Sequence, residues 1–415
     1  MNYGIYTIDD VNLKGQTVLC RLDINSPLGP DGRPGDTTRI KRSLPTIREL
    51  HDKGAKSILM SHQGGDLEYH NYGTTMVHAE IISEALGIEV QFIDDVCGPA
   101  ARAKIAGLRG SEVLMLDNVR YMAEELTLFE TKLKLTFEEQ ADTLLVRKLA
   151  PLADLFLCDA FAAAHRSQPT LVGFPLKLPS IMGRLFENEF TVLSNILENP
   201  KKPCLFILGG AKVQDAFMMM AKVLNDKVAD QVLTCGLVAN IMFLAKGIDI
   251  GNPSREFINK NNLTEYIEVS KKLLNEHGDR IVLPQDFAFV KGKRVEVDIK
   301  DLPVNELIVD VGAKTVAQYV DRIKISKTIF INGPAGIFEK DQSEYGTKSI
   351  WEAVACSDAF SVVGGGDSIT AINKFNLNDK ISYVCTGGGA MVRFLSGEEL
   401  PVVQALRKSA LLYPL

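Results

Sequence analysis

Short apolar runs that alternate with helical patterns are the feature that most constrains how this chain can fold. In the first half, the apolar runs cover residues 17–23, 57–61, 113–117 and 154–159, and helical patterns cover residues 36–50, 75–86 and 137–149. Short, continuous apolar runs are typical of strands that are buried on both faces of a parallel sheet. Strands that alternate with helices form βαβ units, so the pattern predicts an α/β fold built on parallel sheets.

The alternation is interrupted near Pro175 and Pro179 and resumes after Pro203. Six further apolar runs then follow, at residues 205–208, 231–234, 280–283, 328–331, 360–363 and 382–385. Between the two series, Ser180 is a candidate N-cap for a helix that runs to about Asn199 and carries a broad apolar stripe. A chain of 415 residues is longer than a single growing core supports. We therefore predict two parallel-sheet domains joined by this helix, with a ligand-binding cleft between the carboxyl ends of their strands.

The composition is that of a globular protein and argues against several classes. Hydrophobic residues make up 46% of the chain and the formal net charge is −6, so bulk attraction to nucleic acid or to an anionic membrane is not expected. The N-terminal residues lack the pattern of a signal peptide, and no apolar run approaches the length of a membrane span. The seven cysteines are scattered, which indicates buried thiols in a reducing cytoplasm. We expect a cytoplasmic enzyme that binds neither nucleic acid nor a membrane.

Two glycine-rich segments follow apolar runs of the second half, at residues 208–212 and 363–368. Glycines at the carboxyl end of a strand let backbone N–H groups approach an anion, and the start of the next helix adds a favourable dipole. The first segment ends in Lys212, and the second contains Asp367 and Ser368. A lysine for phosphate oxygens and an aspartate for Mg²⁺ are what a phosphoryl-transfer site requires. The segments predict a kinase that acts on small molecules.

Each glycine-rich segment taken alone could equally be a tight turn without a ligand. Neither a P-loop sequence nor a dinucleotide-binding fingerprint is present. A further polar, turn-rich segment at residues 332–339 follows another apolar run, which favours a shared site at the mouth of one sheet.

Basic residues dominate the predicted strand ends of the first half. They are Arg21, Arg39, His62, Arg120, His165 and Arg166. Guanidinium groups pair well with carboxylates and phosphates, so together these residues predict a site for a small polyanion. Taken singly, each arginine could instead be a solvated surface residue, and each histidine could be a structural one.

These motifs, in this order, resemble those of the phosphoglycerate kinase family over essentially the whole chain, and their details are similar to the archaeal branch. The matching stretches are residues 21–27, 36–40, 59–63, 117–120, 159–166, 208–213, 310–315, 332–339, 364–368 and 386–390. The resemblance implies reversible phosphoryl transfer between 1,3-bisphosphoglycerate with ADP and 3-phosphoglycerate with MgATP, in glycolysis and gluconeogenesis. It also implies small-molecule partners only, and a monomer or a homodimer.

The family's fold implies two Rossmann-like domains that close about a hinge. By this resemblance, residues 1–178 would form an N-terminal phosphoglycerate-binding domain and residues 179–199 the interdomain helix. Residues 200–390 would form a C-terminal nucleotide-binding domain, and residues 391–415 would return to the N-terminal domain.

The resemblance also implies roles for individual residues. Substrate binding falls to Asp23, Asn25, Arg39, His62, Gln63, Gly64, Gly65, Arg120 and Arg166. The nucleotide falls to Gly210, Ala211, Lys212, Gly236, Gly312, Asn332, Pro334, Glu339, Gly365, Gly366, Asp367 and Ser368, with Asp367 toward Mg²⁺. Catalysis would depend on Arg39, Lys212 and Gly366. Because the attacking group is already a carboxylate, no general base is required, and positioning and charge neutralisation would carry catalysis.

Two positions depart from the family's pattern. Gly65 stands where a substrate-side arginine is usual, and Ala216 stands where many members have a second lysine. Gly65 and the unusual insert at residues 66–72 leave open a paralogue that phosphorylates another small carboxylate. A dinucleotide-dependent oxidoreductase and a non-catalytic nucleotide-binding relative are further alternatives.

Overall fold

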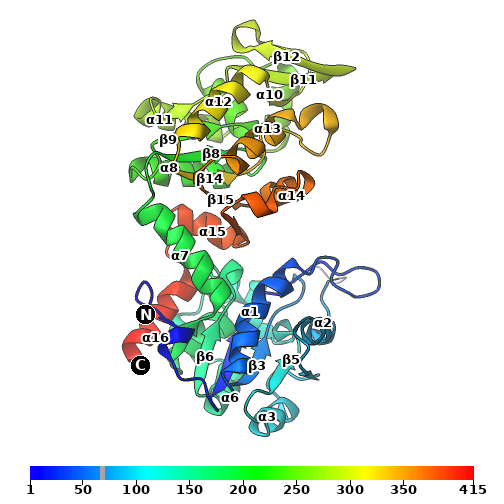
Figure 1. Cartoon of the computed structure of the whole chain (residues 1–415), viewed down its shortest axis with the longest axis vertical. Helices are drawn as coiled ribbons and strands as arrows, with labels where there is room; N and C mark the ends of the chain where they lie inside the picture. The colour runs from blue at the N-terminus through cyan, green and yellow to red at the C-terminus, as the bar shows by residue number, and fades with distance from the viewer. Residues whose placement is uncertain (66–70) are drawn as a thin grey trace. The chain divides into compact units, whose positions relative to one another are not determined.

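Parallel strands form the framework of both halves of the chain. The computed structural model describes residues 1–65 and 71–415. Five residues of the insert noted at 66–72, residues 66–70, lie outside the described residues. The described residues form two units, one made of Met1–Val192 with Glu399–Leu415 and the other of Leu193–Glu398. Each unit contains a parallel sheet with helices packed against it (Figure 1), so the predicted α/β class with two parallel-sheet domains is confirmed.

The first unit contains a sheet of seven strands in the order β1-β7-β6-β2-β3-β5-β4, and all neighbouring pairs are parallel. The strands are β1 (Tyr6–Thr7), β2 (Thr17–Arg21), β3 (Lys56–Met60), β4 (Val90–Ile93), β5 (Val113–Leu116), β6 (Leu155–Cys158) and β7 (Ser180–Met182). The α-helices are α1 (Thr38–Asp52), α2 (Met76–Leu86), α3 (Pro99–Ala106), α4 (Thr127–Leu133), α5 (Phe137–Ala141) and α6 (Leu144–Leu149). All four strands predicted here are present. The sequence did not reveal β1 and β7, which have two and three residues, or β4, in which only Val90 is buried.

Two helix predictions in this unit are wrong. The helix expected over residues 137–149 is two helices, α5 and α6, because Thr143 has an extended backbone conformation (ψ 157°) between them. The helix expected from Ser180 begins instead at Arg184, since residues 180–182 form β7 beside β6. The cap is Asp159, whose Oδ1 accepts hydrogen bonds from Leu185 N at 2.9 Å and Phe186 N at 3.3 Å.

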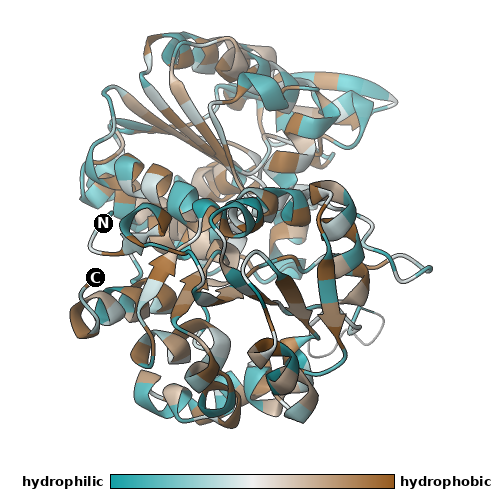
Figure 2. Cartoon of the chain, turned by 60° about the horizontal axis from the view of Figure 1, so that its bottom comes forward, coloured by the Kyte–Doolittle hydropathy of each residue, from teal (hydrophilic) through white to brown (hydrophobic). Residues whose placement is uncertain are grey.

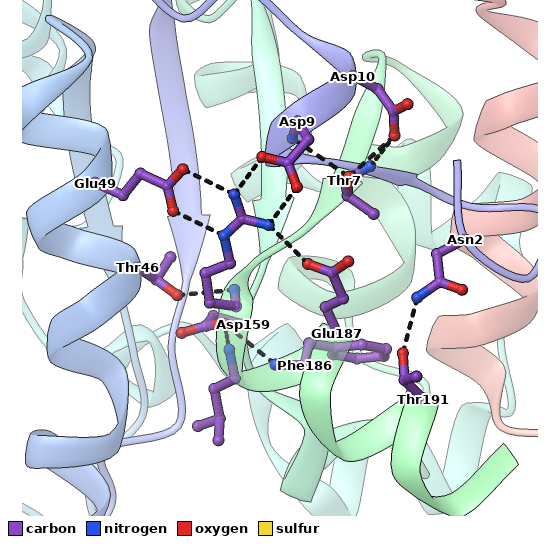
Figure 3. A network of polar contacts seen from close by, with 12 residues as sticks. Asn2, Thr7, Asp9, Asp10, Thr46, Glu49, Asp159, Phe186, Glu187 and Thr191 are labelled. Carbon is purple, nitrogen blue, oxygen red and sulfur yellow. Dashed lines mark hydrogen bonds and ion pairs between the residues drawn. The ribbon is translucent and has the colours of Figure 1, made fainter. Parts of the chain in front are cut away.

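The first turn of this helix, α7 (Arg184–Glu198), is fixed by a cluster of ion pairs (Figure 3). The Arg184 guanidinium donates to Glu49 of α1 through Nε at 2.7 Å and to Asp9 at 2.6 Å and 2.8 Å. It also donates to Glu187 at 3.0 Å. The backbone N–H of Arg184 donates to Thr46 Oγ1 at 2.9 Å, so α1 and α7 are joined by backbone as well as by charge.

The second unit contains a parallel sheet of six strands in the order β10-β9-β8-β14-β15-β16. The strands are β8 (Cys204–Leu208), β9 (Gln231–Thr234), β10 (Ile281–Val282), β14 (Thr328–Asn332), β15 (Phe360–Gly364) and β16 (Tyr383–Cys385). The helices are α8 (Val213–Asn225), α9 (Gly236–Ala245), α10 (Asn252–Lys260), α11 (Tyr266–His277), α12 (Ala313–Ile325), α13 (Tyr345–Ala355), α14 (Gly366–Lys374) and α15 (Gly388–Leu395). Each of the six predicted strands is present.

A second, antiparallel sheet in this unit was not predicted. Its strands are β11 (Asp286–Lys291), β12 (Lys293–Asp298) and β13 (Ile308–Val311), in the order β12-β11-β13. The strand β12 is mostly polar and none of its residues is fully buried, so it lacks the apolar run that reveals the buried strands. In contrast, the strands of the parallel sheets are mostly apolar, and the helices carry hydrophilic faces (Figure 2).

The chain ends in the first unit. The last helix, α16 (Pro401–Leu412), donates from Val402 N to Ala164 O at 3.2 Å and from Ser409 Oγ to Leu178 O at 2.9 Å. The two units divide within α7 and after α15, and the domain boundaries expected near residues 178, 200 and 390 stay predictions. Among the described residues, no helix is long and apolar enough to cross a membrane.

Candidate active site

The basic residues of the first unit gather where parallel strands end. Arg21 is the last residue of β2, His62 follows β3, and Arg120 follows β5. The carboxyl ends of neighbouring parallel strands meet at one edge of a sheet. Arg21 Nη2 lies 3.2 Å from His62 Nδ1, and Arg120 Nη1 donates to the carbonyl oxygen of Gly64, two residues after His62. The structure therefore brings Arg21, His62 and Arg120 together.

Arg39 reaches this cluster from the first turn of α1. Its Nη1 donates to Asp23 Oδ2 at 2.9 Å, and 41% of its side chain stays exposed, compared with 5% for Asp23. Burial by itself would raise the pKa of Asp23, but Arg39 and the neighbouring cations hold that pKa below its usual value. Asp23 thus stays ionised and orients one side of the Arg39 guanidinium, and the other donors of Arg39 are open to a ligand.

Arg120 and Arg166 are also held by contacts within the unit. Arg120 is buried and its Nη1 donates to Gly64 O. Arg166 Nη1 donates to Thr127 Oγ1 at 3.0 Å and lies 4.0 Å from Glu130 Oε2. These contacts restrict the rotamers of two long side chains before any ligand arrives, which lowers the entropy cost of binding an anion.

The loop after β3 shapes the edge of the basic cluster, and its polar groups form hydrogen bonds within the protein. Gln63 is fully buried, and its Nε2 donates to Ser26 O at 2.7 Å and Asn71 O at 3.0 Å. Gly64 has φ of +81° and a Cβ there would lie 2.4 Å from Asn71 O. Gly64 N donates to Asn25 Oδ1 at 2.8 Å. Gln63, Gly64 and Asn25 therefore build the rim of the cluster, and Gly65 contributes no cation to it.

In the second unit, the glycine-rich segments lie side by side at the carboxyl ends of β8, β14 and β15. Gly209 N donates to Asn332 O at 2.9 Å, and Gly333 N donates to Ser368 Oγ at 2.8 Å. A Cβ at Gly333, where φ is +88°, would lie 2.1 Å from Gly209 O. The loops after β8 and β14 therefore touch through their backbones, an approach that requires glycine, and the loop after β15 joins them through the Ser368 hydroxyl.

A small hollow opens between these loops. It is lined by Gly209, Gly210, Ala211, Lys212, Asn332, Gly333, Gly365, Gly366, Asp367 and Ser368. Lys212 is exposed at the N-cap of α8, and Gly366 is the first residue of α14. Free backbone N–H groups at the start of a helix and a nearby ammonium group favour phosphate oxygens.

A larger pocket of about 260 Å³ adjoins this hollow, because Gly210, Ala211 and Asp367 line both. The lining of the larger pocket includes Gly236, Leu237, Asn240, Phe257, Phe287, Leu307, Val309, Val311, Pro334, Ile337 and Glu339. Apolar walls next to an anion-binding loop suit a nucleotide, with its base against the walls and its phosphates at the glycines.

Two residues implied for the nucleotide have other contacts. Gly312 lines neither hollow, and a Cβ there would lie 2.3 Å from Asp286 Oδ2, so its packing requires glycine. Ser368 is fully buried, and its hydroxyl accepts the Gly333 hydrogen bond. Ser368 therefore joins two loops, and the remaining residues implied for the nucleotide all line the two hollows.

Several pocket residues were missed by the sequence analysis. Phe287 lies on β11, in the sheet that the sequence did not reveal. Asn240 lies on α9, is only 3% exposed, and has an Oδ1 without a hydrogen-bond partner in the described part of the chain. Buried amides are normally satisfied, so a ligand that donates to Asn240 would complete it. Neither residue belongs to a local sequence motif. Only their burial, on a strand and on a helix, could have suggested a role in the pocket.

Asp367 is the candidate for contact with Mg²⁺. Within residues 1–65 and 71–415, no group of three His, Cys, Asp or Glu residues could hold a metal ion. Asp367 is exposed and lines both hollows. Mg²⁺ commonly binds one or two carboxylates together with substrate phosphates and water, so a single aspartate fits an ion that arrives with a nucleotide.

Comparison with known proteins identifies the family. The family model described as phosphoglycerate kinase matches residues 8–398. The chain belongs to the phosphoglycerate kinase family. Relatives with that name include the protein of Methanothermobacter thermautotrophicus, 45% identical over 99% of this chain and 98% of that protein. The protein of Thermococcus kodakarensis is 42% identical over 98% of each.

Solved structures agree with this assignment. Phosphoglycerate kinase from Pyrococcus horikoshii OT3 is 41% identical, with a TM-score of 0.88 over 99% of this chain and 100% of that one. The enzyme from Coxiella burnetii is 31% identical, with a TM-score of 0.83 over 97% and 98%. The predicted family is confirmed, and with it a kinase that transfers a phosphoryl group to a carboxylate. The paralogous kinase, the oxidoreductase and the non-catalytic relative are not favoured.

Proposed function

We propose that the first unit binds 3-phosphoglycerate at its basic cluster and that the second unit binds MgATP or MgADP at its glycine-rich loops. The observation that carries the proposal is the pair of adjoining hollows in the second unit. They join an anion-binding loop to an apolar pocket through Gly210, Ala211 and Asp367. A phosphoglycerate kinase needs such a nucleotide site together with a site for a small polyanion.

The cations of the first unit would hold the phosphate and carboxylate of 3-phosphoglycerate. Arg120 and Arg166 are already oriented by Gly64 and Thr127. Arg39 is oriented by Asp23 and keeps exposed donors, so it would neutralise charge on the transferring phosphoryl. The acceptor carboxylate is ionised at neutral pH and attacks without a general base.

In the second unit, Lys212 and the backbone N–H groups from Gly366 onward would hold the phosphate oxygens of the nucleotide. Asp367 would hold Mg²⁺, which when bound neutralises charge on the phosphates. Gly366 would act through its backbone only. The catalytic contribution of these residues is therefore positioning and electrostatic stabilisation.

A coupled assay of ATP-dependent phosphorylation of 3-phosphoglycerate tests the proposal, with Lys212→Ala as the comparison. We expect turnover by the wild type and a loss of about a hundredfold or more in kcat/KM for the variant. Folded protein that binds MgATP but does not phosphorylate 3-phosphoglycerate would contradict the proposed substrate. Other small carboxylates would then be assayed, with Gly65 as the first position to examine.

Two finer expectations belong to the same proposal. All seven cysteines are free, which supports a location in the reducing cytoplasm. A monomer or a homodimer stays a prediction, and the mass of the protein in solution tests it.

A further inference from the structure

One buried hydrogen-bond chain leads to His62 from the protein interior. Arg21, which is 0% exposed, lies with its Nη2 3.2 Å from His62 Nδ1. Arg21 Nε donates to Thr170 Oγ1 at 2.9 Å, and Arg21 Nη1 donates to Leu22 O. Because Arg21 is fully buried behind His62, it would act on a ligand of the proposed substrate site only through His62.

The chemistry of arginine decides which group donates in the hydrogen bond between Arg21 and His62. A guanidinium group carries five N–H donors and no acceptor. Arg21 Nη2 must therefore donate to His62 Nδ1, and Nδ1 must be the unprotonated nitrogen of the ring. In a neutral imidazole the hydrogen then resides on Nε2. His62 is held as an Nε2–H donor.

The far end of the chain holds Arg21 in place. Thr170 Oγ1 accepts from Arg21, so its own hydrogen is directed to Glu125 Oε2 at 2.8 Å. Thr170 N donates to Glu125 Oε1 at 2.6 Å. Glu125 is 0% exposed, so its charge is balanced mainly by the nearby guanidinium of Arg21. Burial raises the pKa of Glu125, against the opposing effects of Arg21 and of the hydrogen bonds from Thr170. In the ionised form of Glu125, the hydrogen bonds run from Arg21 to Thr170 to Glu125.

The electrostatic environment of His62 agrees with this assignment. Burial lowers the pKa of His62 well below its usual value, and Arg21, Arg120 and Arg166 lower it further, against an opposing effect of Asp23. A second ring hydrogen would also face Arg21 directly. His62 is therefore neutral near neutral pH.

We propose that Arg21 is a positioning residue, fixed by Thr170 and Glu125, that holds His62 in the Nε2–H tautomer so that His62 offers a neutral hydrogen-bond donor to the bound anion. The inference deepens the proposed substrate site and rests on it only for the identity of the anion. The charged arginines attract any anion. The hydrogen bond from neutral His62 Nε2–H forms only when an oxygen of the anion lies in line with it, so His62 would select the orientation of the ligand.

The tautomer can be observed directly by multiple-bond ¹H–¹⁵N NMR of the full-length ¹⁵N-labelled chain near neutral pH. The His62 signals are assigned by comparison with His62→Gln. We expect Nδ1 of wild-type His62 to give the shift of an unprotonated ring nitrogen and Nε2 that of a protonated one. An Nδ1–H tautomer, an even mixture or an imidazolium would overturn the inference.

Two variants test the source of the tautomer. Arg21→Met removes the donor at similar length, and Thr170→Val removes the hydroxyl that fixes Arg21. We expect both to shift His62 toward a mixture of tautomers, with the larger change in Arg21→Met. If the buried charge of Glu125 prevents folding, Arg21→Met combined with Glu125→Gln restores the charge balance. Unchanged His62 spectra in these folded variants would overturn the role of Arg21.

Kinetics of the same variants separate positioning from simple charge. Arg21→Met should lower kcat/KM for 3-phosphoglycerate by about tenfold to a hundredfold, the range for a hydrogen bond to a charged group. In a His62→Gln background, where the amide has no tautomers, the loss caused by Arg21→Met should be smaller. Equal losses in both backgrounds would overturn the coupling. If the proposed substrate is wrong, turnover is absent while the NMR result still decides the tautomer.

Discussion

The two units build their anion sites from different material. In the first unit the cations are side chains, and protein groups hold them, as Asp23 holds Arg39 and the carbonyl oxygen of Gly64 holds Arg120. In the second unit the donors are mostly backbone N–H groups of loops that touch at Gly209 and Gly333. A side-chain site can lose one function at little cost in stability, whereas a backbone site fails when its shape changes. The predictions below test this difference.

The largest effect is expected at Arg39, the exposed cation of the side-chain site. Arg39→Ala should lower kcat by about a hundredfold to a thousandfold, because it removes charge that neutralises the transferring phosphoryl. The free energy of unfolding should fall less than in Gly333→Ala, because other groups besides Arg39 balance the buried charge of Asp23. Steady-state kinetics with Arg33→Ala, another exposed arginine of this unit, provide the control. A rise in KM for 3-phosphoglycerate at unchanged kcat would assign Arg39 to binding alone.

In the backbone site, Gly333→Ala should destabilise the protein by about 3 kcal/mol, since the new Cβ would collide with Gly209 O. Nucleotide affinity should fall with it. Gly366→Ala is the matched control, because no atom lies within 4 Å of its Cβ position and the backbone N–H is kept. Chemical unfolding and nucleotide titration measure both variants. Similar losses in the two would show that the loop contacts do not set the shape of the site.

Buried carboxylates provide a third contrast. Burial raises the pKa of Asp159 in the first unit to about 7, and its partners are Thr46 and the backbone of α7, without a cation. Burial also raises the pKa of Asp310 in the second unit to about 6, although Arg294 Nη1 lies 2.8 Å from its Oδ2.

Asp159 binds its proton more tightly folded than unfolded, so its contribution to stability should fall as the pH rises from about 4 to about 7. In the wild type this fall should amount to about 1.4 kcal/mol for each unit by which the pKa is raised. Asp159→Asn keeps an acceptor for Leu185 N but has no titrating carboxyl, so its stability should not show the fall. Asp310→Asn should instead destabilise, because Arg294 loses its charged partner. Unfolding curves across this pH range decide. Parallel pH profiles for wild type and Asp159→Asn would refute the assignment.

The smallest effect is expected at Asp367, a single side chain in the backbone site. Asp367→Asn should weaken use of the Mg–nucleotide by about tenfold and leave the KM for 3-phosphoglycerate nearly unchanged. Asp379→Asn makes the same charge change at another exposed position of the unit. Kinetics at varied Mg²⁺ concentration compare them. Equal loss for both substrates would point to a distorted turn at residues 364–368.

The sequence predicted those parts of the molecule that depend on local pattern. Buried parallel strands such as β8 and β15 show as apolar runs, and their glycine-rich ends lie in the adjoining hollows. The pocket walls could not be predicted, because Asn240 and Phe287 come from distant elements without a motif. The start of α7 was mispredicted because its cap, Asp159, lies 26 residues before Leu185 in the sequence.

The same distinction explains Gln63 and Gly312. The resemblance to the family implies that both bind ligands. In the structure, the Gln63 side-chain amide donates to two backbone carbonyl oxygens, and Gly312 packs against Asp286. A motif residue can be needed for the shape of a site without touching a ligand, and only the tertiary contacts separate the two cases.

The position of α16 has a consequence for how the molecule is made. The second unit is one continuous stretch of chain, whereas the first unit requires residues Glu399–Leu415, which are synthesised after the whole of the second unit. Leu178 O receives its hydrogen bond from Ser409 only after synthesis of everything between them. The second unit can therefore complete its fold first, while the first unit, although begun earlier, must wait until the second unit and residues 399–415 have been synthesised.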